Sequence, residues 1–525
     1  MKIFLIYPSS GSQLGFNYGV AHMAAILKNA GHHIEYWQLC EDLEPLPSEE
    51  QFADCIIQKS PDMLAFSVVT NQWTYTQQLA SWARKVFAGP IVIGGIHTLA
   101  GADEILRTGL FDYVFRGECE DAFLEFVEKL RQDEPLDNVA NLAYSRNGQI
   151  IINPVRSLPD LPTLPPKDYE SMDFQRLIDA KNGWVGLMTS RGCPFSCTYC
   201  FNHVMVSTYK HELKCSFKEL NYIRRFGVEQ VIDEIKYLQD HYRNITMFIF
   251  DDDIFTFDES YVERFCRAYK RVTDIPFVVN AHVGFFDERR ARALAEANCR
   301  IVKFGIESGS PEIRGRILNR HMSNDSIVQA IKTVRDFKMH SSIFLIIGFP
   351  HETSDDVYET IKLTARALPG RFRWTYFFPF PGTRAHQISE EGRFIDFEKM
   401  ERLKNFTDES CLDFGPEQNL LLKKVGRILP WFVNAHSDLP VAGFYREQIQ
   451  KLLDMDEEQW QQVSPALYEK DKEYSQRFSQ RGLSHYAIKY NRFMGVISDY
   501  FLNEEQGPAP ASAAHARSIN SGRAF

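Results

Sequence analysis

The sequence lacks an uninterrupted apolar run of about 18 residues, the length that a membrane-spanning helix requires. Its apolar start, Met1 to Pro8, is too short for the core of a secretory signal, and no cleavage site follows. An excess of basic residues is also missing, because the formal net charge is −10. These absences predict a cytoplasmic protein with no integral membrane segment and no non-specific affinity for nucleic acid.

Two enzyme signatures are missing as well. The chain has no Gly-x-Gly-x-x-Gly fingerprint for dinucleotides and no Gly-x-Ser-x-Gly nucleophile elbow. Ten cysteines in 525 residues, three of them clustered, do not form the framework of a disulfide-stapled fold. The sequence therefore argues against a dinucleotide oxidoreductase, a serine hydrolase and a disulfide scaffold.

What the chain does contain is a repeated alternation of short apolar runs with helical patterns. Over residues 1–145 this alternation predicts a doubly wound, Rossmann-like parallel sheet. The expected strands there are Lys2–Tyr7, His33–Gln38, Asp62–Val69, Pro90–Gly94 and Asp112–Phe115. A proline-rich stretch then predicts an extended connector over residues 146–182.

The alternation resumes over residues 183–388, where six strand–helix units suit a partial (β/α)6 barrel. Residues 389–506 have helical patterns, and we expect them to form a helical cap that shapes the barrel's pocket. Residues 507–525 are rich in Ala, Ser, Gly and Pro, which predicts a disordered tail. The overall expectation is an α/β chain with a helical C-terminal region.

The most informative feature is the spacing of three cysteines, Cys193, Cys197 and Cys200, directly after the first barrel strand. Three thiolates packed this closely can hold three irons of a cubane cluster. No fourth cysteine follows at a ferredoxin-like spacing, so one iron keeps an open position. The alternative is a structural zinc site, but such sites usually have four ligands in paired spacing.

This Cys-x3-Cys-x2-Cys motif resembles the signature of the radical S-adenosylmethionine (SAM) superfamily. Segments at later strand ends fit the same resemblance. It implies that the acidic run Asp251–Asp253 meets the SAM amine, although the usual Gly-Gly-Glu is absent. We expect Asp251 or Asp252 in that role, with Asp253 left open. The resemblance further implies ribose contacts from Glu307 and Ser308 and an adenine wall at Gly348.

The N-terminal domain resembles the cobalamin-binding domain that precedes many radical SAM barrels. Three segments carry this likeness: Gly15–His22, Ile93–His97 and Asp112–Glu120. The family's Asp-x-His-x-x-Gly motif is missing, which implies that no histidine of that loop binds the cobalt. The alternative is a nucleotide-binding or vestigial Rossmann-like domain. The expected cofactor contacts are Phe16, Asn17, Tyr18, Gly19, Ser67, Thr70, Gly94, Gly95, His97, Gly117 and Glu118.

The resemblance implies three cofactors, a 4Fe-4S cluster, SAM and cobalamin. It also implies an electron donor such as flavodoxin or ferredoxin. The expected activity is methylation of an unactivated carbon in a small molecule, lipid or natural-product intermediate through a 5′-deoxyadenosyl radical. The alternatives are a radical SAM cyclase or rearrangement enzyme that uses cobalamin, and a cobalamin or cluster sensor. The substrate does not follow from the sequence.

Overall fold

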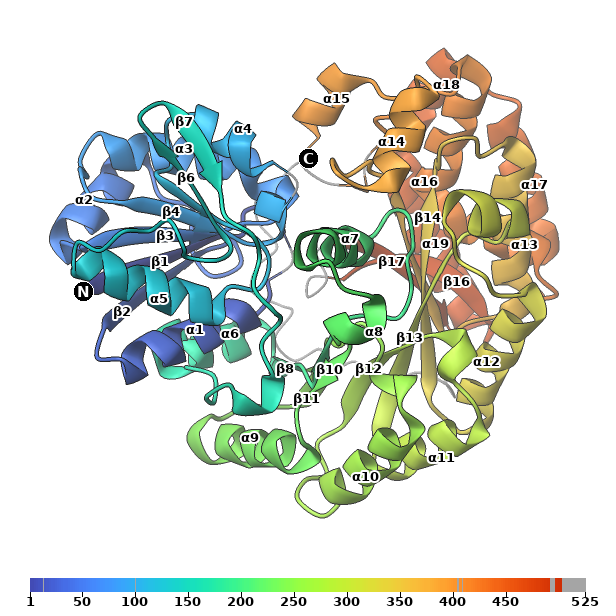
Figure 1. Cartoon of the computed structure of the whole chain (residues 1–525). Helices are drawn as coiled ribbons and strands as arrows, with labels where there is room; N and C mark the ends of the chain where they lie inside the picture. Colours follow the sequence, from blue (N-terminus) through green and yellow to red (C-terminus); the bar gives the residue numbers. More distant parts are fainter. Residues whose placement is uncertain (13, 100, 404–405, 408, 492–495, 503–525) are drawn as a thin grey trace.

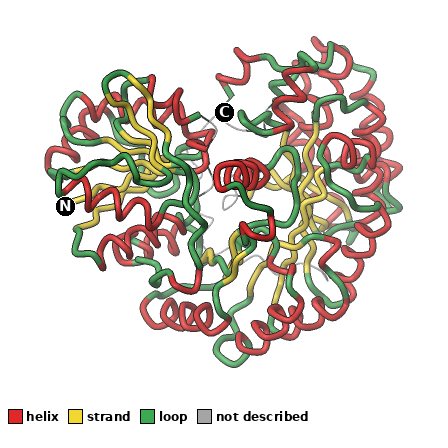
Figure 2. Tube along the Cα trace, viewed as in Figure 1, coloured by secondary structure: helices red, strands yellow, loops and turns green. Residues whose placement is uncertain are grey.

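The computed structural model describes residues 1–502, except 13, 100, 404–405, 408 and 492–495. The chain forms two lobes, an N-terminal sheet domain and a larger curved sheet that begins near residue 184 (Figure 1). In the larger lobe the strands line the inside of the curve and the helices cover its outside (Figure 2). The predicted fold class, a doubly wound domain followed by a partial barrel, is confirmed.

The N-terminal sheet has the strand order β2-β1-β3-β4-β5-β6-β7. Its first five strands pair in parallel, and the last two are antiparallel. Their bounds are β1 Lys2–Pro8, β2 His33–Leu39, β3 Met63–Ser67, β4 Ile91–Gly94, β5 Tyr113–Phe115, β6 Leu142–Arg146 and β7 Gln149–Ile152.

Helices cover both faces of this sheet, as expected for a doubly wound fold. Side chains of α1 and α5 pack in one apolar core, whereas α2, α3 and α4 pack in a second. These helices are α1 Tyr18–Asn29, α2 Glu49–Lys59, α3 Trp73–Arg84, α4 Ala102–Arg107 and α5 Glu120–Arg131.

The predicted connector starts too early, because β6 and β7 form a hairpin that extends the N-terminal sheet to Ile152. Asn147 and Gly148 form its turn and both have positive φ. Asn-Gly is the strongest local signal for such a turn, but the nearby prolines favoured an extended connector. The rest of the connector is not wholly extended, since it contains helix α6, Phe174–Ala180. The connector packs on α1, where the Asp168 amide donates to the Ala21 carbonyl at 3.1 Å.

The larger sheet contains six parallel strands in the order β8-β11-β12-β13-β14-β15. The strands are β8 Trp184–Leu187, β11 Met247–Phe250, β12 Phe277–Ala281, β13 Cys299–Glu307, β14 His340–Ile347 and β15 Arg371–Tyr376. The helices between them are α9 Val228–His241, α10 Glu259–Tyr269, α11 Glu288–Glu296, α12 Asn324–Asp336 and α13 Ser354–Ala367.

Two further helices follow the first barrel strand, α7 Phe201–Leu213 and α8 Phe217–Leu220. A short antiparallel pair, β9 Ser190–Arg191 with β10 Arg224–Arg225, flanks them in the chain. In Figure 1, α7 lies between the two lobes. These four elements were not predicted, because the segment between the cysteine motif and α9 has no long apolar strand pattern.

The C-terminal region is only partly helical. Helix α16, Pro416–His436, packs beside β15, where the Trp374 indole donates to the Gly426 carbonyl at 2.8 Å. Strands β16 His485–Asn491 and β17 Val496–Leu502 then extend the barrel sheet, with β17 antiparallel to β15. The other helices here are α14 Arg384–Glu391, α15 Phe397–Arg402, α17 Ala442–Leu453, α18 Glu457–Val463 and α19 Leu467–Gln480.

The expectation of a helical cap as far as residue 506 was therefore wrong for the two strands. In β16 the residues Tyr486, Ile488 and Tyr490 alternate with mostly polar ones, which is a strand signal, whereas β17 has no such alternation. The predicted disordered tail, residues 507–525, lies outside the described residues. Within the described ranges, no helix has the length and apolar character needed to cross a membrane.

Candidate functional site

The cysteine loop lies at the carboxyl end of the first barrel strand, β8. Cys193 follows β9, Cys197 lies in the loop, and Cys200 immediately precedes the first residue of α7. Cys197 is buried and the other two are half-buried. The carboxyl ends of barrel strands are where reactive groups gather in α/β barrels, so the thiols occupy the expected edge.

Two side chains donate hydrogen bonds to these sulfurs. Arg320 Nη1 lies 3.5 Å from Cys197 Sγ, and Asn202 Nδ2 lies 3.5 Å from Cys200 Sγ. Hydrogen bonds to cluster sulfurs and nearby positive charge stabilise thiolate and tune a cluster's reduction potential. The donor set therefore fits a cluster held by thiolates.

The loop geometry also bears on the alternative of a single metal ion. In the described part of the chain, no three His, Cys, Asp or Glu side chains converge as ligands of one ion. Zinc requires such convergence, with four ligands about one point. In a cubane each thiolate binds a different iron, so the three sulfurs remain apart.

The acidic run after β11 contains three carboxylates with three different environments. Asp252 is fully buried and accepts hydrogen bonds from Thr189 N at 3.0 Å, Thr189 Oγ1 at 2.6 Å and the Ser190 hydroxyl. Asp251 accepts from the Tyr18 hydroxyl at 2.7 Å. Since Asp252 is enclosed by the strand-end backbone, the predicted SAM contact at Asp252 is not supported by its position.

Asp253 is the carboxylate that lies beside the cysteines. It accepts a hydrogen bond from Asn202 Nδ2 at 3.1 Å, and the same amide nitrogen contacts Cys200 Sγ. The Asp253 side chain is exposed and lines the cavity between the lobes, so a cation bound there could meet its carboxylate. The sequence analysis left Asp253 open, and its position makes it the better candidate for the SAM amine.

The predicted ribose and adenine segments lie at the ends of β13 and β14. Glu307 has a φ of 68° and is buried against Arg320 and Tyr199, and burial raises the pKa of its carboxyl. Ser308 is fully buried, with its hydroxyl 3.3 Å from Thr360 Oγ1 on α13. The structure therefore packs Ser308 into the fold, whereas Glu307 stays next to the cysteine loop.

Gly348 begins the loop after β14 with a φ of 79°. Its amide donates to Glu352 Oε2 at 2.5 Å, and the Phe349 amide donates to the same oxygen at 3.3 Å. Burial raises the pKa of Glu352 to about 8. This side chain stabilises the loop that was predicted to form the adenine wall.

A cavity of about 770 Å³ lies between the N-terminal sheet and the barrel. On the barrel side it is lined by Tyr199, Cys200 and Asn202 of the cysteine loop and the start of α7, and by Asp253 after β11. Thr70 and His97 are not among the lining residues. Ten of the predicted cofactor contacts do line the cavity: Phe16, Asn17, Tyr18, Gly19, Ser67, Gly94, Gly95, Gly117, Glu118 and Asp251.

Glycine is required at two points of the cavity wall. A Cβ on Gly95, which has a φ of +105°, would lie 2.5 Å from the Val68 carbonyl oxygen. A Cβ on Gly117, with a φ of +73°, would lie 2.3 Å from the Tyr209 hydroxyl. The close packing against Val68 and Tyr209 explains these two glycines, and the cavity of about 770 Å³ is also lined by apolar side chains such as Ala65 and Val92, which suits a large ring. The residues present thus fit a corrin.

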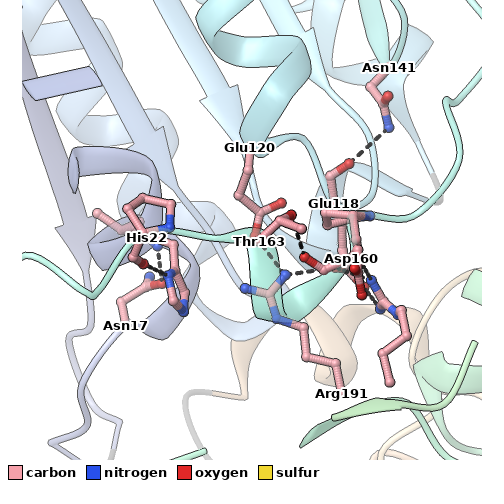
Figure 3. A network of polar contacts seen from close by, with 12 residues as sticks. Asn17, His22, Glu118, Glu120, Asn141, Asp160, Thr163 and Arg191 are labelled. Atoms are coloured by element: carbon pink, nitrogen blue, oxygen red, sulfur yellow. Dashed lines mark hydrogen bonds and ion pairs between the residues drawn. The ribbon is translucent and has the colours of Figure 1, made fainter. Parts of the chain in front are cut away.

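A buried charge network joins this cavity to the barrel (Figure 3). Arg191 Nη1 lies 2.6 Å from carboxylate oxygens of both Glu118 and Glu120, and Arg224 binds Glu118 as well. Burial alone would raise the pKa of Glu118, but the two guanidinium groups hold it below its ordinary value. The Glu118 carboxylate, predicted as a cofactor contact, is therefore engaged by the barrel.

Neither candidate histidine of the N-terminal domain lines the cavity. His22 on α1 is buried against the connector. Its Nδ1 lies 3.1 Å from the Pro165 carbonyl, and its ring is stacked on Phe226. Burial lowers the pKa of His22 to about 2, so the ring is neutral. The His97 ring lies against Trp73, with a centroid distance of 4.8 Å and an angle of 34° between the ring planes, and His97 does not line the cavity.

Comparisons with known proteins agree with this geometry. The B12 binding domain model matches residues 10–127, and the Radical SAM superfamily model matches residues 187–364. The chain is 28% identical over 433 residues to "Uncharacterized methyltransferase PH0819" of Pyrococcus horikoshii, covering 78% of this chain and 89% of that protein. It is 24% identical over 436 residues to the anaerobic magnesium-protoporphyrin IX monomethyl ester cyclase of Rubrivivax gelatinosus, covering 79% and 75%.

The fold is also similar to a solved structure of the radical SAM methyltransferase TsrM from Kitasatospora setae with cobalamin and a [4Fe-4S] cluster bound. The TM-score is 0.60 at 14% identity, covering 74% of this chain and 75% of that one. Two domains in this order, meeting at one cavity, define a B12-binding radical SAM protein. The chain carries the B12 binding domain and the Radical SAM superfamily domain in this order, and these two domains imply a 4Fe-4S cluster, SAM and cobalamin as cofactors.

Proposed function

We propose that the protein is a cobalamin-dependent methyltransferase that acts on an unactivated carbon of a small molecule, lipid or natural-product intermediate. One observation supports this above all. A single cavity has the glycine-rich ends of β3–β5 on one wall and Cys200 and Asp253 on the other. A substrate there would lie between a methyl donor and a radical source. The name of the Pyrococcus relative, a methyltransferase, supports the same reaction class.

The proposal gives the chain's residues separate tasks. Cys193, Cys197 and Cys200 would hold the cluster, with Arg320 and Asn202 stabilising sulfur charge. When bound, the cluster and SAM would supply a 5′-deoxyadenosyl radical and methylcobalamin the methyl group, so the protein's part is binding, orientation and exclusion of water.

The carboxylates would orient SAM. Asp253 can accept from its cationic amine, since it faces the cavity beside Cys200. Glu307 can accept from a ribose hydroxyl, as proposed from its strand-end position, although it does not line the cavity. Tyr18 donates a hydrogen bond to Asp251 and lines the cavity itself, so it links the two lobes at the cavity wall.

A second candidate reaction is oxidative cyclisation, because the Rubrivivax relative is named a cyclase. The same cavity would serve both reactions. The mass of the product separates them, since methyl transfer adds one methylene equivalent per event whereas cyclisation removes hydrogen.

Anaerobic reconstitution tests the proposal. Wild-type protein with iron, sulfide and cobalamin should bind about four irons per chain. With methyl-deuterated SAM and a low-potential reductant, it should be assayed on lipids, phosphonates, tetrapyrroles and peptides. Transfer of the labelled methyl to carbon is the expected result, whereas a product that lost hydrogen without gaining label would favour the cyclase.

The matched controls replace the three cysteines of the motif in one variant and a cysteine outside the motif in another. Replacing Cys193, Cys197 and Cys200 by Ala should abolish iron binding and SAM cleavage. Replacing Cys55, a half-buried cysteine on α2, should leave both intact. Retention of the full iron content by the triple variant would show that the cluster is held elsewhere.

A further inference from the structure

A second hollow, of about 640 Å³, lies on the other side of the cysteine loop. Its floor is Pro194, Phe195 and Ser196, the residues between Cys193 and Cys197. We call it the α7 groove. Its remaining lining residues are His203, Val206, Ser207, Lys210, His211, Cys215 and Phe217. None of its residues lines the cavity between the lobes.

Helix α7 separates the two hollows. The groove is lined by helix positions 203, 206, 207, 210 and 211, whose spacing of three and four places them on one face. The other face packs toward the N-terminal domain, where the Tyr209 hydroxyl accepts from the Glu118 amide at 2.9 Å and Met205 lines the cavity. The cysteine loop can therefore be approached from two sides, one enclosed by both lobes and one from outside.

Basic residues lie at and next to the α7 groove: Lys210 lines it, and Lys214 and Lys218 adjoin its lining residues Cys215 and Phe217 in the sequence. Lys210, Lys214 and Lys218 are exposed, and the described residues offer none of them an ion pair or a side-chain hydrogen bond. Of the carboxylates on α7 and α8, Glu212 pairs with Arg116, whereas Glu219 accepts from the Ser216 amide and keeps its negative charge, so the three lysines outweigh it. The whole chain carries a net charge of −10, so this patch is opposite in sign to the rest of the protein.

The groove also offers apolar contact close to the cysteines. Phe217 is 37% exposed, which is high for a phenylalanine, and Phe195 is half-buried on the loop itself. An apolar centre with a charged rim is typical of a protein–protein interface. The substrate and SAM would lie on the cavity side, where Asp253 and Cys200 face each other, so they do not explain this outer surface.

We propose that the α7 groove is the docking site for a small acidic electron-carrier protein. Its prosthetic group would face Phe195, and one electron would pass through the Pro194–Ser196 segment to the cluster. The carrier is oxidised by one electron and the cluster is reduced by one, with no atom or proton transferred. The proposal rests on the cluster assignment and not on methyl transfer.

The test uses the full chain with its cluster reconstituted anaerobically. The groove variant carries Lys210→Glu, Lys214→Glu and Lys218→Glu. Reduction of the cluster is followed by stopped-flow absorbance with reduced flavodoxin, with reduced ferredoxin and with dithionite. At low salt we expect the variant to be at least about tenfold slower with whichever carrier serves the wild type, because like charges repel at the interface. Dithionite, which needs no docking surface, should reduce both proteins equally.

A matched control makes the same charge change elsewhere. Lys270, Lys451 and Lys470 are exposed and form no ion pair within the described chain, and all three are changed to Glu. The control should keep the wild-type rate with both carriers. Equal slowing in the control, or an unchanged rate in the groove variant, would overturn the proposal.

Binding and salt dependence give readouts that need no turnover. Titration of oxidised flavodoxin and ferredoxin should show at least about tenfold weaker binding to the groove variant. Wild-type reduction by the carriers should slow as ionic strength rises, since exposed charges are screened within about 10 Å at 0.1 M salt. Carrier reduction that is insensitive to salt would contradict the proposal even if the variants failed to fold. If the carriers reduce the cluster normally but no substrate is methylated, only the proposed function is contradicted, and the docking proposal stands.

Discussion

The hydroxyl of Tyr18 donates a hydrogen bond to Asp251 Oδ2 at 2.7 Å, although the two residues are 233 positions apart in the chain. Tyr18 is the first residue of α1 in the N-terminal domain, and Asp251 directly follows barrel strand β11. Burial, and after it the charge of Asp251, raise the pKa of Tyr18, so the phenol keeps its proton and remains a donor. One side chain thus links the wall proposed to bind the corrin to the strand end proposed to face SAM.

Replacing Tyr18 by Phe should remove this tie and little else. Hydrogen bonds to charged groups contribute about 1.5–3 kcal/mol, and Asp251 would lose its donor. We expect cobalamin affinity, measured by absorbance titration, to fall about tenfold, because the contact between the two lobes at the cavity wall is lost. The control is Tyr36→Phe, which removes a 3.3 Å hydrogen bond to Gln38 on strand β2. Equal affinities in the two variants would show that Tyr18 does not position the cofactor wall.

The sequence predicted the parts of this site that depend on local pattern. Strand β1 and the cysteine loop follow from apolar periodicity and from the spacing of Cys193, Cys197 and Cys200. Three adjacent aspartates look alike in sequence, and only the β8–β11 pairing decides that Asp252 is enclosed while Asp253 is not. Arg320 reaches Cys197 from 123 positions away, and no local pattern announces such a contact.

Asp253→Asn should weaken SAM binding while leaving the cluster in place. The change removes a negative charge beside Cys200 without touching a thiol, and we expect about tenfold lower affinity by equilibrium dialysis. Asp252→Asn should act differently, because the Asp252 carboxylate accepts three hydrogen bonds inside the strand ends. It should lower the free energy of unfolding by about 1–3 kcal/mol. If Asp252→Asn and not Asp253→Asn impaired SAM binding, our assignment would be reversed.

Arg191→Met should be strongly destabilising, since it leaves the Glu118 and Glu120 carboxylates buried without their shared partner. Breaking a buried ion pair in this way typically costs about 3–5 kcal/mol, which urea denaturation can measure. Arg131→Met, which breaks an exposed pair with Glu128, should cost at most about 1 kcal/mol.

A compensated variant separates charge from packing in this network. Adding Glu118→Gln and Glu120→Gln to Arg191→Met removes the unpaired charges, so part of the lost stability should return. No recovery in the compensated protein would mean that Arg191 acts through its contacts alone, and that the network is not an electrostatic clamp between the lobes.

Glu352→Gln should change how stability depends on pH. Burial raises the pKa of Glu352 from 4.5 to about 8, so between those values the folded protein holds a proton that the unfolded chain has released. The free energy of unfolding therefore falls as pH rises through this window, by up to about 1.4 kcal/mol per pH unit, and the dependence ends above about pH 8.

Gln keeps an acceptor for the Gly348 and Phe349 amides but cannot ionise. Urea denaturation across the window should thus give a flatter profile for Glu352→Gln than for wild type. The exposed Glu447→Gln should leave the wild-type slope unchanged, and an equally steep slope in Glu352→Gln would show that Glu352 is already ionised in the folded protein.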